Sequence, residues 1–475
     1  PQGDSFQSPH RGILITDNTV KKDEEKKEIK TEDKSEIVNN ALPKVIVVPY
    51  IGLGFDSSLP GAPDKDKKND ENRHLSPREL NLPFIRFNEK GLELINPLLV
   101  SGIKENKKGD GLELLGSKLN PKENFATMDL PSQSVASLFD VLSEKFPAVE
   151  KNVLYRLAKV GTFVAIDVPL MVASHEMGHA GAGSATCPLC NPSVNITNWM
   201  SGYTSYNAPA GVSFSDKEKL FMSVAGMNQA TFNGEEIDRR MHTKGADIAN
   251  VVQYLVNITN NANYQVKDWI KNSPPGYNDG ATYHKMMEER NKGWNQGSLS
   301  SLAVGVNLLN VDFWASLIGG INYVATGKQV KLPEIKLGGA AVSFPHFSLL
   351  NTYEGPQLNT SIYGHLENSK PTLELKYSTL ITPDNGPGMG VELRLHNLDV
   401  PGTNNLLSVS PRVGVSAHDG QPGYKIGGEI DFKPFSNKNF AFSTGMDYNK
   451  NYLPEAYLPF SEGFQGMVGF KAGFM

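Results

Sequence analysis

Two histidines and a glutamate in the segment 174–180 have the residue types and the spacing of a hydrolytic metal site. His175 and His179 are four residues apart, so on a helix both imidazoles project from one face and can reach one zinc ion. Glu176 would stand beside the open position of that metal. We expect Glu176 to take a proton from the attacking water and to pass it to a leaving amine, while zinc polarises the carbonyl under attack. A structural pair of histidines is the alternative interpretation.

The HExxH pattern of these residues resembles that of the zincin metallopeptidases, over the motif and its helix. The resemblance implies hydrolysis of peptide bonds in a protein or peptide substrate. It also implies that His175 and His179 bind Zn²⁺ and that Glu176 is the catalytic base. A metzincin would continue with a glycine and a third histidine, but Ala182 and Ala185 occupy those positions. The sequence therefore disfavours that branch.

The third zinc ligand lies outside the motif. In gluzincins a glutamate from a downstream helix completes the site, and Glu235 or Glu236 is the corresponding candidate here. Both lie near the end of a predicted helix, whose phase gives a slight preference to Glu235. We expect Asp238 to hold one of the histidine ligands in its orientation by accepting a hydrogen bond.

The charged segment around these carboxylates departs from the gluzincin pattern. That family commonly has an aspartate four residues after the ligand glutamate, whereas Arg239 and Arg240 occupy those positions here. A solvated charged turn is therefore the alternative interpretation of this segment. His242 and His284 are the next candidates for the third ligand.

The only two cysteines of the chain, Cys187 and Cys190, follow the motif closely. A single CxxC supplies half of a structural zinc site, and the sequence has no second one. In an oxidising compartment we expect a local disulfide that shapes the loop beside the site. A redox or metal-binding role is the alternative.

Helical periodicity surrounds the motif. Apolar residues recur at helical spacing from Ser134 onward, and further helices are predicted to begin near Ser215 and near Asp247. Glu218 follows Ser215 by three residues, which is the spacing of a capping box. These elements predict a helical metallopeptidase region at residues 125–330.

The apolar segment 302–325 is long enough to cross a bilayer. Asp312 lies near its middle, where a charge facing lipid is costly. We therefore expect a buried core helix or a helix that lines a cavity.

The hydrophobic period changes to two after about residue 340. Leu373 and Leu375 alternate with Glu374 and Lys376, for example, so each strand has one apolar face and one face that mixes charges of both signs with Gly and Ser. Such a polar face suits the crowded lumen of a small barrel whose apolar face meets lipid. The predicted strands cover residues 342–350, 358–366, 373–381, 391–395, 407–415, 424–432, 440–448 and 464–474. They predict an antiparallel, transmembrane β-barrel of about eight strands at residues 331–475.

This region resembles bacterial outer-membrane β-barrels, whose chains end on a strand with an aromatic residue at or next to the C-terminus, as Phe474 is here. The resemblance is one of pattern over roughly the last 135 residues. It implies outer-membrane lipid as a partner. A soluble β-sandwich or barrel is the alternative.

Length and charge limit the remaining possibilities. A chain of 475 residues favours two or three structural units, and 46 basic against 51 acidic residues disfavour nucleic acid as a partner. Residues 1–43 have the mixed charges of a disordered tether, and the start at Pro1 implies a targeting segment that is absent or already removed. Residues 44–124 are β-rich, with a strand at 45–55 and a hairpin at 84–100 that would widen the barrel if they joined it.

Together these patterns predict an α+β protein. We expect a zinc-dependent metalloendopeptidase in the bacterial outer membrane, with its active site facing the periplasm or the barrel lumen. The alternative is a non-enzymatic outer-membrane barrel protein with a degenerate zincin-like region, acting in envelope structure or binding.

Overall fold

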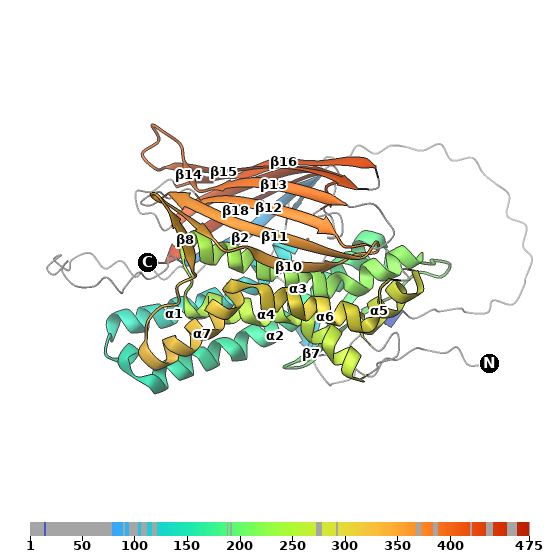
Figure 1. Ribbon diagram of the computed structural model, residues 1–475, viewed down its shortest axis with the longest axis horizontal. Coiled ribbons are helices and arrows are strands. Elements are labelled where there is room, and N and C mark those ends of the chain that lie inside the picture. Colours follow the sequence, from blue (N-terminus) through green and yellow to red (C-terminus); the bar gives the residue numbers. More distant parts are fainter. Residues whose placement is uncertain are drawn as a thin grey trace, which may run out of the picture.

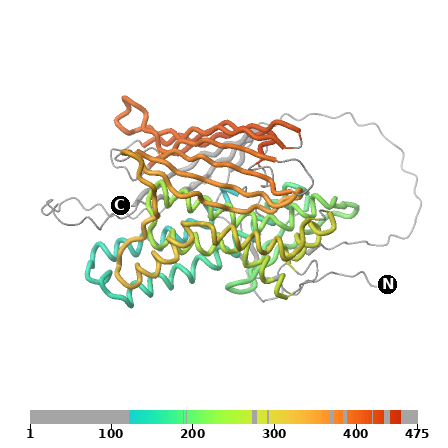
Figure 2. The backbone as a smooth tube through the Cα atoms, viewed as in Figure 1, coloured from blue at the N-terminus to red at the C-terminus, as the bar shows by residue number. Residues whose placement is uncertain are grey.

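The computed structural model has the α+β architecture that the sequence predicts, with helices in the middle of the chain and a large antiparallel sheet after them (Figures 1 and 2). Before residue 121 the structure describes only the backbone of five strands, and for 463–474 it again describes the backbone alone. The other described residues are 121–187, 189–190, 192–271, 278–290, 293–366, 372–382, 388–418, 420–433 and 440–453.

The helices of the described residues pack around a main apolar core and smaller apolar clusters beside it. They are α1 (Pro121–Lys145), α2 (Val153–Thr186), α3 (Asp216–Lys244), α4 (Ile248–Lys271), α5 (Asp279–Arg290), α6 (Gln296–Leu309) and α7 (Val311–Thr326), with a 3₁₀ turn at Val149–Lys151. Phe163 of α2, Ile237 of α3 and Val251 of α4 are fully buried in that core. Burial of these side chains fixes α2, α3 and α4 against one another.

Two of the predicted helix starts are confirmed by their caps. The Ser215 side chain accepts a hydrogen bond from the backbone of Glu218, whose own side chain accepts one from the backbone of Ser215. Asp247 accepts hydrogen bonds from the backbone N–H groups of Ala249 and Asn250. Both caps satisfy N–H groups that a helix leaves without partners at its start.

The apolar segment 302–325 forms two helices instead of one. Asn310 separates α6 from α7, and its side chain donates to the carbonyl of Phe347, 2.6 Å away, and accepts from the same residue's N–H. Asp312 is completely buried, but the expectation of a buried core helix is wrong for α7, because Ile318 and Ile321 lie on its exposed side. By length and composition, α2 is the one described helix that could cross a membrane, and α6 with α7 would be a second if that pair, bent by 62°, were one span.

A second, smaller sheet lies beside α2 and interrupts the region predicted to be helical. A hairpin of β6 (Pro192–Asn198) and β7 (Ser201–Tyr206) forms its centre, and the strand order is β1-β7-β6-β5-β4. The outer strands are β1 (Leu14–Ile15), β4 (Ile103–Glu105) and β5 (Leu112–Leu115). Apart from β1, the predicted tether at 1–43 lies outside the described residues, as does the predicted strand at 45–55.

The large sheet has 13 strands and is antiparallel throughout. Its order is β3-β2-β18-β17-β16-β15-β13-β12-β11-β9-β8, with β10 paired to β11 and β14 paired to β15. The strands are β2 (Arg78–Asn88), β3 (Gly91–Leu94), β8 (Glu334–Leu337), β9 (Ala340–Ser343), β10 (His346–Asn351), β11 (Pro356–Leu366), β12 (Thr372–Leu380), β13 (Met389–His396), β14 (Leu398–Asp399), β15 (Leu407–His418), β16 (Gln421–Phe432), β17 (Phe440–Lys450) and β18 (Gly463–Phe474).

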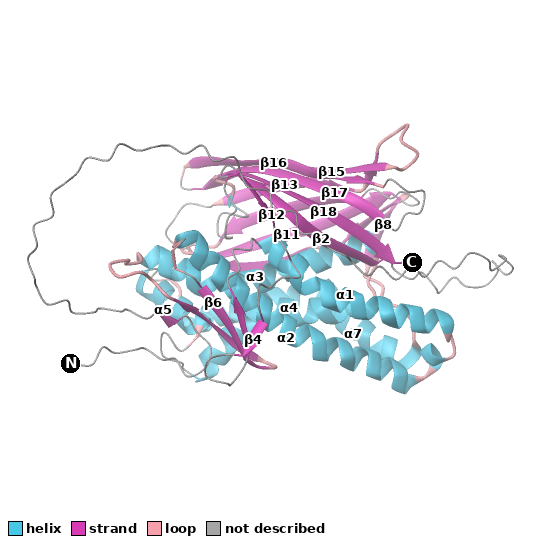
Figure 3. Ribbon diagram, turned by 180° about the vertical axis from the view of Figure 1, so that it is seen from behind, coloured by secondary structure: helices cyan, strands magenta, loops and turns pink. Residues whose placement is uncertain are grey.

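The expectation of a closed barrel of about eight strands is wrong for the described chain. The hairpin predicted at 84–100 is present as β2 and β3, and β2 extends the sheet by pairing with β18. Among the described strands, β3 and β8 pair on one side only, so the sheet is open. The helical region lies along one face of the sheet (Figures 1 and 3). In a closed barrel of eight strands this face would line the lumen, which the barrel's own side chains would fill.

The two faces of the large sheet are reversed relative to a soluble protein, as the alternation predicts. Glu392 is 4% exposed on the face toward the helices, whereas its neighbour Leu393 is 42% exposed on the other face. The register continues this pattern across strands, because Leu393 pairs with both Leu375 and Val413. The outer face is therefore a continuous apolar surface.

Candidate metal centre

Three side chains from two helices converge on one point. His175 and His179 lie one turn apart on α2, with their Nε2 atoms 3.2 Å apart. Asp279, the first residue of α5, places Oδ2 2.8 Å from Nε2 of His175 and 3.0 Å from Nε2 of His179. His175 is 1% exposed, His179 2% and Asp279 4%, so the group is closed to solvent.

The separation of these atoms fits a tetrahedral metal ion. Two ligands about 2.0–2.1 Å from Zn²⁺ at a tetrahedral angle are about 3.3 Å apart, close to the 3.2 Å between the two Nε2 atoms. The ligand atoms of His175, His179 and Asp279 all lie within 4.8 Å of one another. Two imidazoles and one carboxylate are also the donor set of many catalytic zinc sites, which keep the fourth position for water.

Electrostatics in this group favour a positive charge between the ligands. Burial lowers the pKa of His179, but Asp279 outweighs it and raises the pKa to about 9. Burial raises the pKa of Asp279, yet the charges and hydrogen bonds of His179 and His175 hold it well below its usual value. Without a metal the site thus retains a proton among its ligands. A bound divalent cation would replace that proton as the positive charge between them.

Neighbouring groups orient both imidazoles. Nδ1 of His179 lies 2.6 Å from the carbonyl oxygen of Met222 on α3, an arrangement in which Nδ1 donates and Nε2 is left for a metal. The ring of His175 stacks on Tyr264 of α4, with centroids 4.8 Å apart and planes 10° apart. Each ring is therefore fixed by a different helix.

Glu176 points from the same helix toward the small sheet. The hydroxyl of Thr204 on β7 lies 3.0 Å from Oε2 of Glu176 and 2.8 Å from its carbonyl oxygen. Burial raises the pKa of Glu176, although the nearby charges of His175 and His179 act in the opposite direction. A carboxylate with a raised pKa beside a metal site is suited to accept and return a proton near neutral pH.

Glycines allow α3 to approach the centre closely. A Cβ atom on Gly226 would lie 2.5 Å from Nε2 of both His175 and His179. A Cβ on Gly178 would lie 2.7 Å from the carbonyl oxygen of Ala225. Gly178 and Gly226 therefore permit the close packing of α3 against α2.

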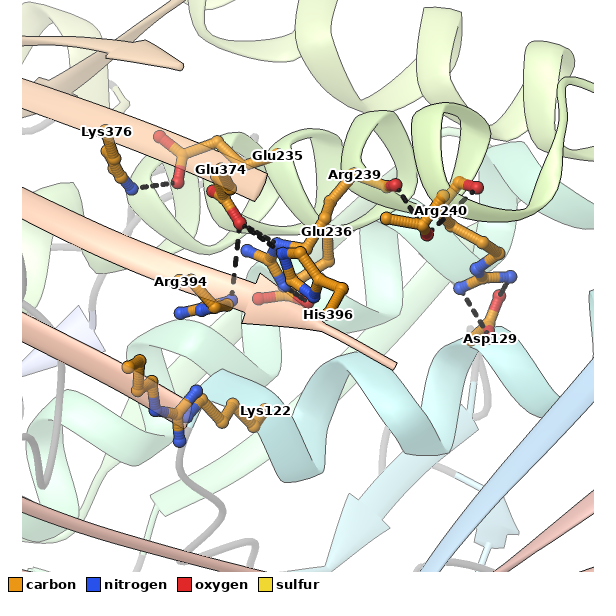
Figure 4. Close-up of polar contacts among 12 residues, drawn as sticks. Lys122, Asp129, Glu235, Glu236, Arg239, Arg240, Glu374, Lys376, Arg394 and His396 are labelled. Carbon is orange, nitrogen blue, oxygen red and sulfur yellow. Dashed lines mark hydrogen bonds and ion pairs between the residues drawn. The ribbon is translucent and has the colours of Figure 1, made fainter. Parts of the chain in front are cut away.

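Glu235 and Glu236 do not meet the histidines. Glu235 accepts a hydrogen bond from Lys376 at 2.6 Å (Figure 4). It also accepts hydrogen bonds from Asn359 at 2.8 Å and from Ser348, and all three donors lie on the large sheet. Glu236 pairs with Arg239. Gly226, which faces the histidines, precedes Glu235 by nine residues, or about 13 Å of helix. The first half of α3 thus contacts the centre, through Met222 and Gly226, and its second half contacts the sheet.

Asp279 is a ligand candidate that no pattern in the sequence predicts. It follows His179 by 100 residues, and its only local signal is the start of a helix, where the Asn278 side chain accepts from the backbone N–H of Ala281. His284 lies on the same helix but belongs to neither group of possible metal ligands among the described residues. Burial lowers the pKa of His284 to about 4, so this ring is neutral.

The remaining predicted residues lie in two other places. Cys187 and Cys190 form a disulfide just after α2, beside the strand β6. Asp238 does not orient His175 or His179; it lies near His242 in a separate buried group, described below. Comparison of the chain with protein family models, curated proteins and solved structures found no match, so its interpretation depends on this geometry.

Proposed function

We propose that this chain is a zinc-dependent metallopeptidase with its centre at His175, His179 and Asp279. The observation that carries the proposal is the convergence of these three ligand atoms within 4.8 Å, with Glu176 one residue from the first ligand. When bound, Zn²⁺ would supply a Lewis acid for the scissile carbonyl and lower the pKa of water to about 7.

The chain's own residues would hold and move the proton. Glu176 accepts it from the attacking water and returns it to the leaving amine. Thr204 fixes the carboxylate through the hydroxyl that lies 3.0 Å from Oε2. Gly202, whose Cβ would lie 2.8 Å from Cγ of Glu176, leaves the room that this carboxylate needs.

An extended peptide is the substrate that the neighbourhood of Glu176 best accommodates. The outer edge of β7 pairs in parallel with β1, through Leu14 opposite Ser205 and Ile15 opposite Tyr206. Ser205 is adjacent to Thr204, so a main chain bound along this edge passes close to Glu176. A substrate taking the place of β1 would bind through main-chain hydrogen bonds, as in other complexes that add a strand to a sheet.

We also propose that the outer face of the large sheet lies against the acyl chains of a bacterial outer membrane. The support is the reversal of its faces: Leu375, Leu393 and Val413 are 42–50% exposed, while Glu374 and Glu392 are buried. An apolar surface of this extent in water would promote aggregation. Lipid is the environment in which an outward apolar and inward polar face is stable.

Replacement of the base tests the catalytic proposal. We expect Glu176→Gln to retain zinc and to lose at least about 100-fold in peptide cleavage, the scale for removal of a general base. Glu288→Gln, at an exposed position on α5, is the matched control and should cleave like the wild type. Cleavage by Glu176→Gln at the wild-type rate would show that this carboxylate is not the base.

A second candidate is a non-enzymatic outer-membrane protein in which the centre binds a structural metal. The specific observation in its favour is burial, since His175, Glu176, His179 and Asp279 are only 1–4% exposed. A wild-type protein that holds zinc but cleaves no peptide library, with or without detergent, would favour this candidate.

A further inference from the structure

A second group of possible metal ligands lies where the helices meet the large sheet. Asp238 on α3, Asp312 on α7 and His346 on β10 place ligand atoms within 4.8 Å of one another. Asp238 and Asp312 are completely buried and His346 is 2% exposed. None of these residues belongs to the centre at His175.

His242 adjoins this group of three from α3, one turn after Asp238. Its Nε2 lies 3.1 Å from Oδ2 of Asp312 and 4.0 Å from Oδ1 of Asp238. Nδ1 of His346 lies 3.4 Å from the same Oδ1 of Asp238. Two of these three distances are close to the separation of about 3.3 Å between tetrahedral zinc ligands.

Several polar atoms in the group have no hydrogen-bond partner among the described residues. They are Oδ1 of Asp312, Nε2 of His346 and Oγ of Ser316, which lies one turn after Asp312 on α7. The Asp238 carboxylate accepts a hydrogen bond from Tyr363. A buried polar atom without a partner costs about 1–3 kcal/mol, and more if it is charged. A cation bound between Asp238, Asp312 and His346 would give the Asp312 carboxylate a partner and neutralise the two buried carboxylates.

We propose that Asp238, His242, Asp312 and His346 bind a second divalent metal ion. Two imidazoles and two carboxylates are donors that suit Zn²⁺. Four protein ligands leave no position for water, so this site is structural. It joins the end of α3 and the start of α7 to β10, and thereby fixes the helical region to the sheet. The pairs Asp238–His242 and His175–His179 have the same spacing of four residues, which presents both side chains on one helix face.

Metal content after loading the full-length protein with Zn²⁺ and removing the excess tests this proposal. We expect two zinc ions per chain in the wild type, one in His175→Ala and one in His346→Gln. His396→Gln is the control, because His396 is another buried histidine at the same interface, bonded to Glu374 but outside both groups, and this variant should retain two. If His346→Gln does not fold, Asp312→Asn replaces it, and a Co²⁺ titration of His175→Ala reports the remaining tetrahedral site by its visible absorption.

The outcomes separate the two sites. A single wild-type zinc that is lost in His175→Ala would overturn the second site and leave the first. A single zinc that persists in His175→Ala and is lost in His346→Gln would support the second site and overturn the first. Retention of two ions in both His346→Gln and Asp312→Asn would show that a hydrogen-bonded charge cluster, without metal, occupies this interface.

Discussion

The helical region and the large sheet bury opposite kinds of side chain. The helices enclose an apolar core around Phe163, Ile237 and Val251. The sheet instead turns its charged residues inward and leaves its apolar residues exposed. The difference indicates that the two regions are stabilised differently, the helices by burial of apolar side chains and the inner face of the sheet by paired charges. Contact of the apolar outer face with lipid, as proposed above, would complete this division.

The charged layer between the two regions is a network of ion pairs. Arg239 of α3 lies 3.0 Å from Glu374, which also lies 2.8 Å from His396 (Figure 4). Elsewhere in the layer, Lys122 of α1 lies 3.0 Å from Asp447. Ion pairs in this layer hold the helices to the sheet, whereas apolar packing holds the helices to one another.

The largest effect is expected from breaking a buried pair in the charged layer. Glu235→Gln leaves Lys376 without its carboxylate partner, so we expect the free energy of unfolding to fall by about 3–5 kcal/mol while zinc content is unchanged. Denaturant unfolding in detergent measures this, and Glu288→Gln is the control. Loss of zinc in Glu235→Gln with unchanged stability would instead favour the prediction that Glu235 is the third zinc ligand.

The apolar face of the sheet is tested by adding a charge to it. Leu393→Lys should weaken binding to lipid vesicles by about 2–4 kcal/mol, the cost of a lysine facing the middle of a bilayer. Val212→Lys, at a similarly exposed position in the loop before α3, should have little effect. Equal binding by both variants, or a monodisperse wild type without detergent, would contradict the lipid proposal.

The close approach of α3 to the candidate metal centre predicts a smaller effect on metal binding. Gly226→Ala places a Cβ atom 2.5 Å from both Nε2 atoms, so we expect zinc affinity to fall by about 10–100-fold, as for changes that disturb ligand orientation. Gly234→Ala in the same helix meets only an ordinary contact with Ile258 at 3.4 Å and should bind zinc normally. Competition with a chromogenic chelator compares the two variants.

The smallest effect is expected at the exposed start of α3. Ser215→Ala removes the capping box and should lower the free energy of unfolding by about 1 kcal/mol. Hydrogen bonds from the Ser215 side chain and backbone lower the pKa of Glu218 below its unfolded value of 4.5. The ionised carboxylate therefore stabilises the fold at pH values above 4.5. That contribution is lost as pH falls below 4.5, and Ser215→Ala should flatten this part of the pH dependence. An unchanged profile in the variant would contradict the role of the cap.

Local patterns in the sequence determined the features that depend on neighbouring residues. The spacing of His175 and His179 predicts that they share a helix face, and the structure places their Nε2 atoms 3.2 Å apart. Alternation around Leu393 predicts which side chains of the sheet are exposed, and the caps at Ser215 and Asp247 mark where helices begin. These features follow from the geometry of a helix turn or a strand, so a short segment suffices to encode them.

Only the tertiary structure decided which distant segments meet. Asp279, 100 residues beyond His179, reaches the histidines because α5 packs beside α3, whereas Glu235 faces the sheet because its helix continues about 13 Å past Gly226. The addition of β2 to β18 likewise set the extent and the open form of the sheet. Spacing along the chain carries no information on such contacts, since they depend on how whole elements pack against one another.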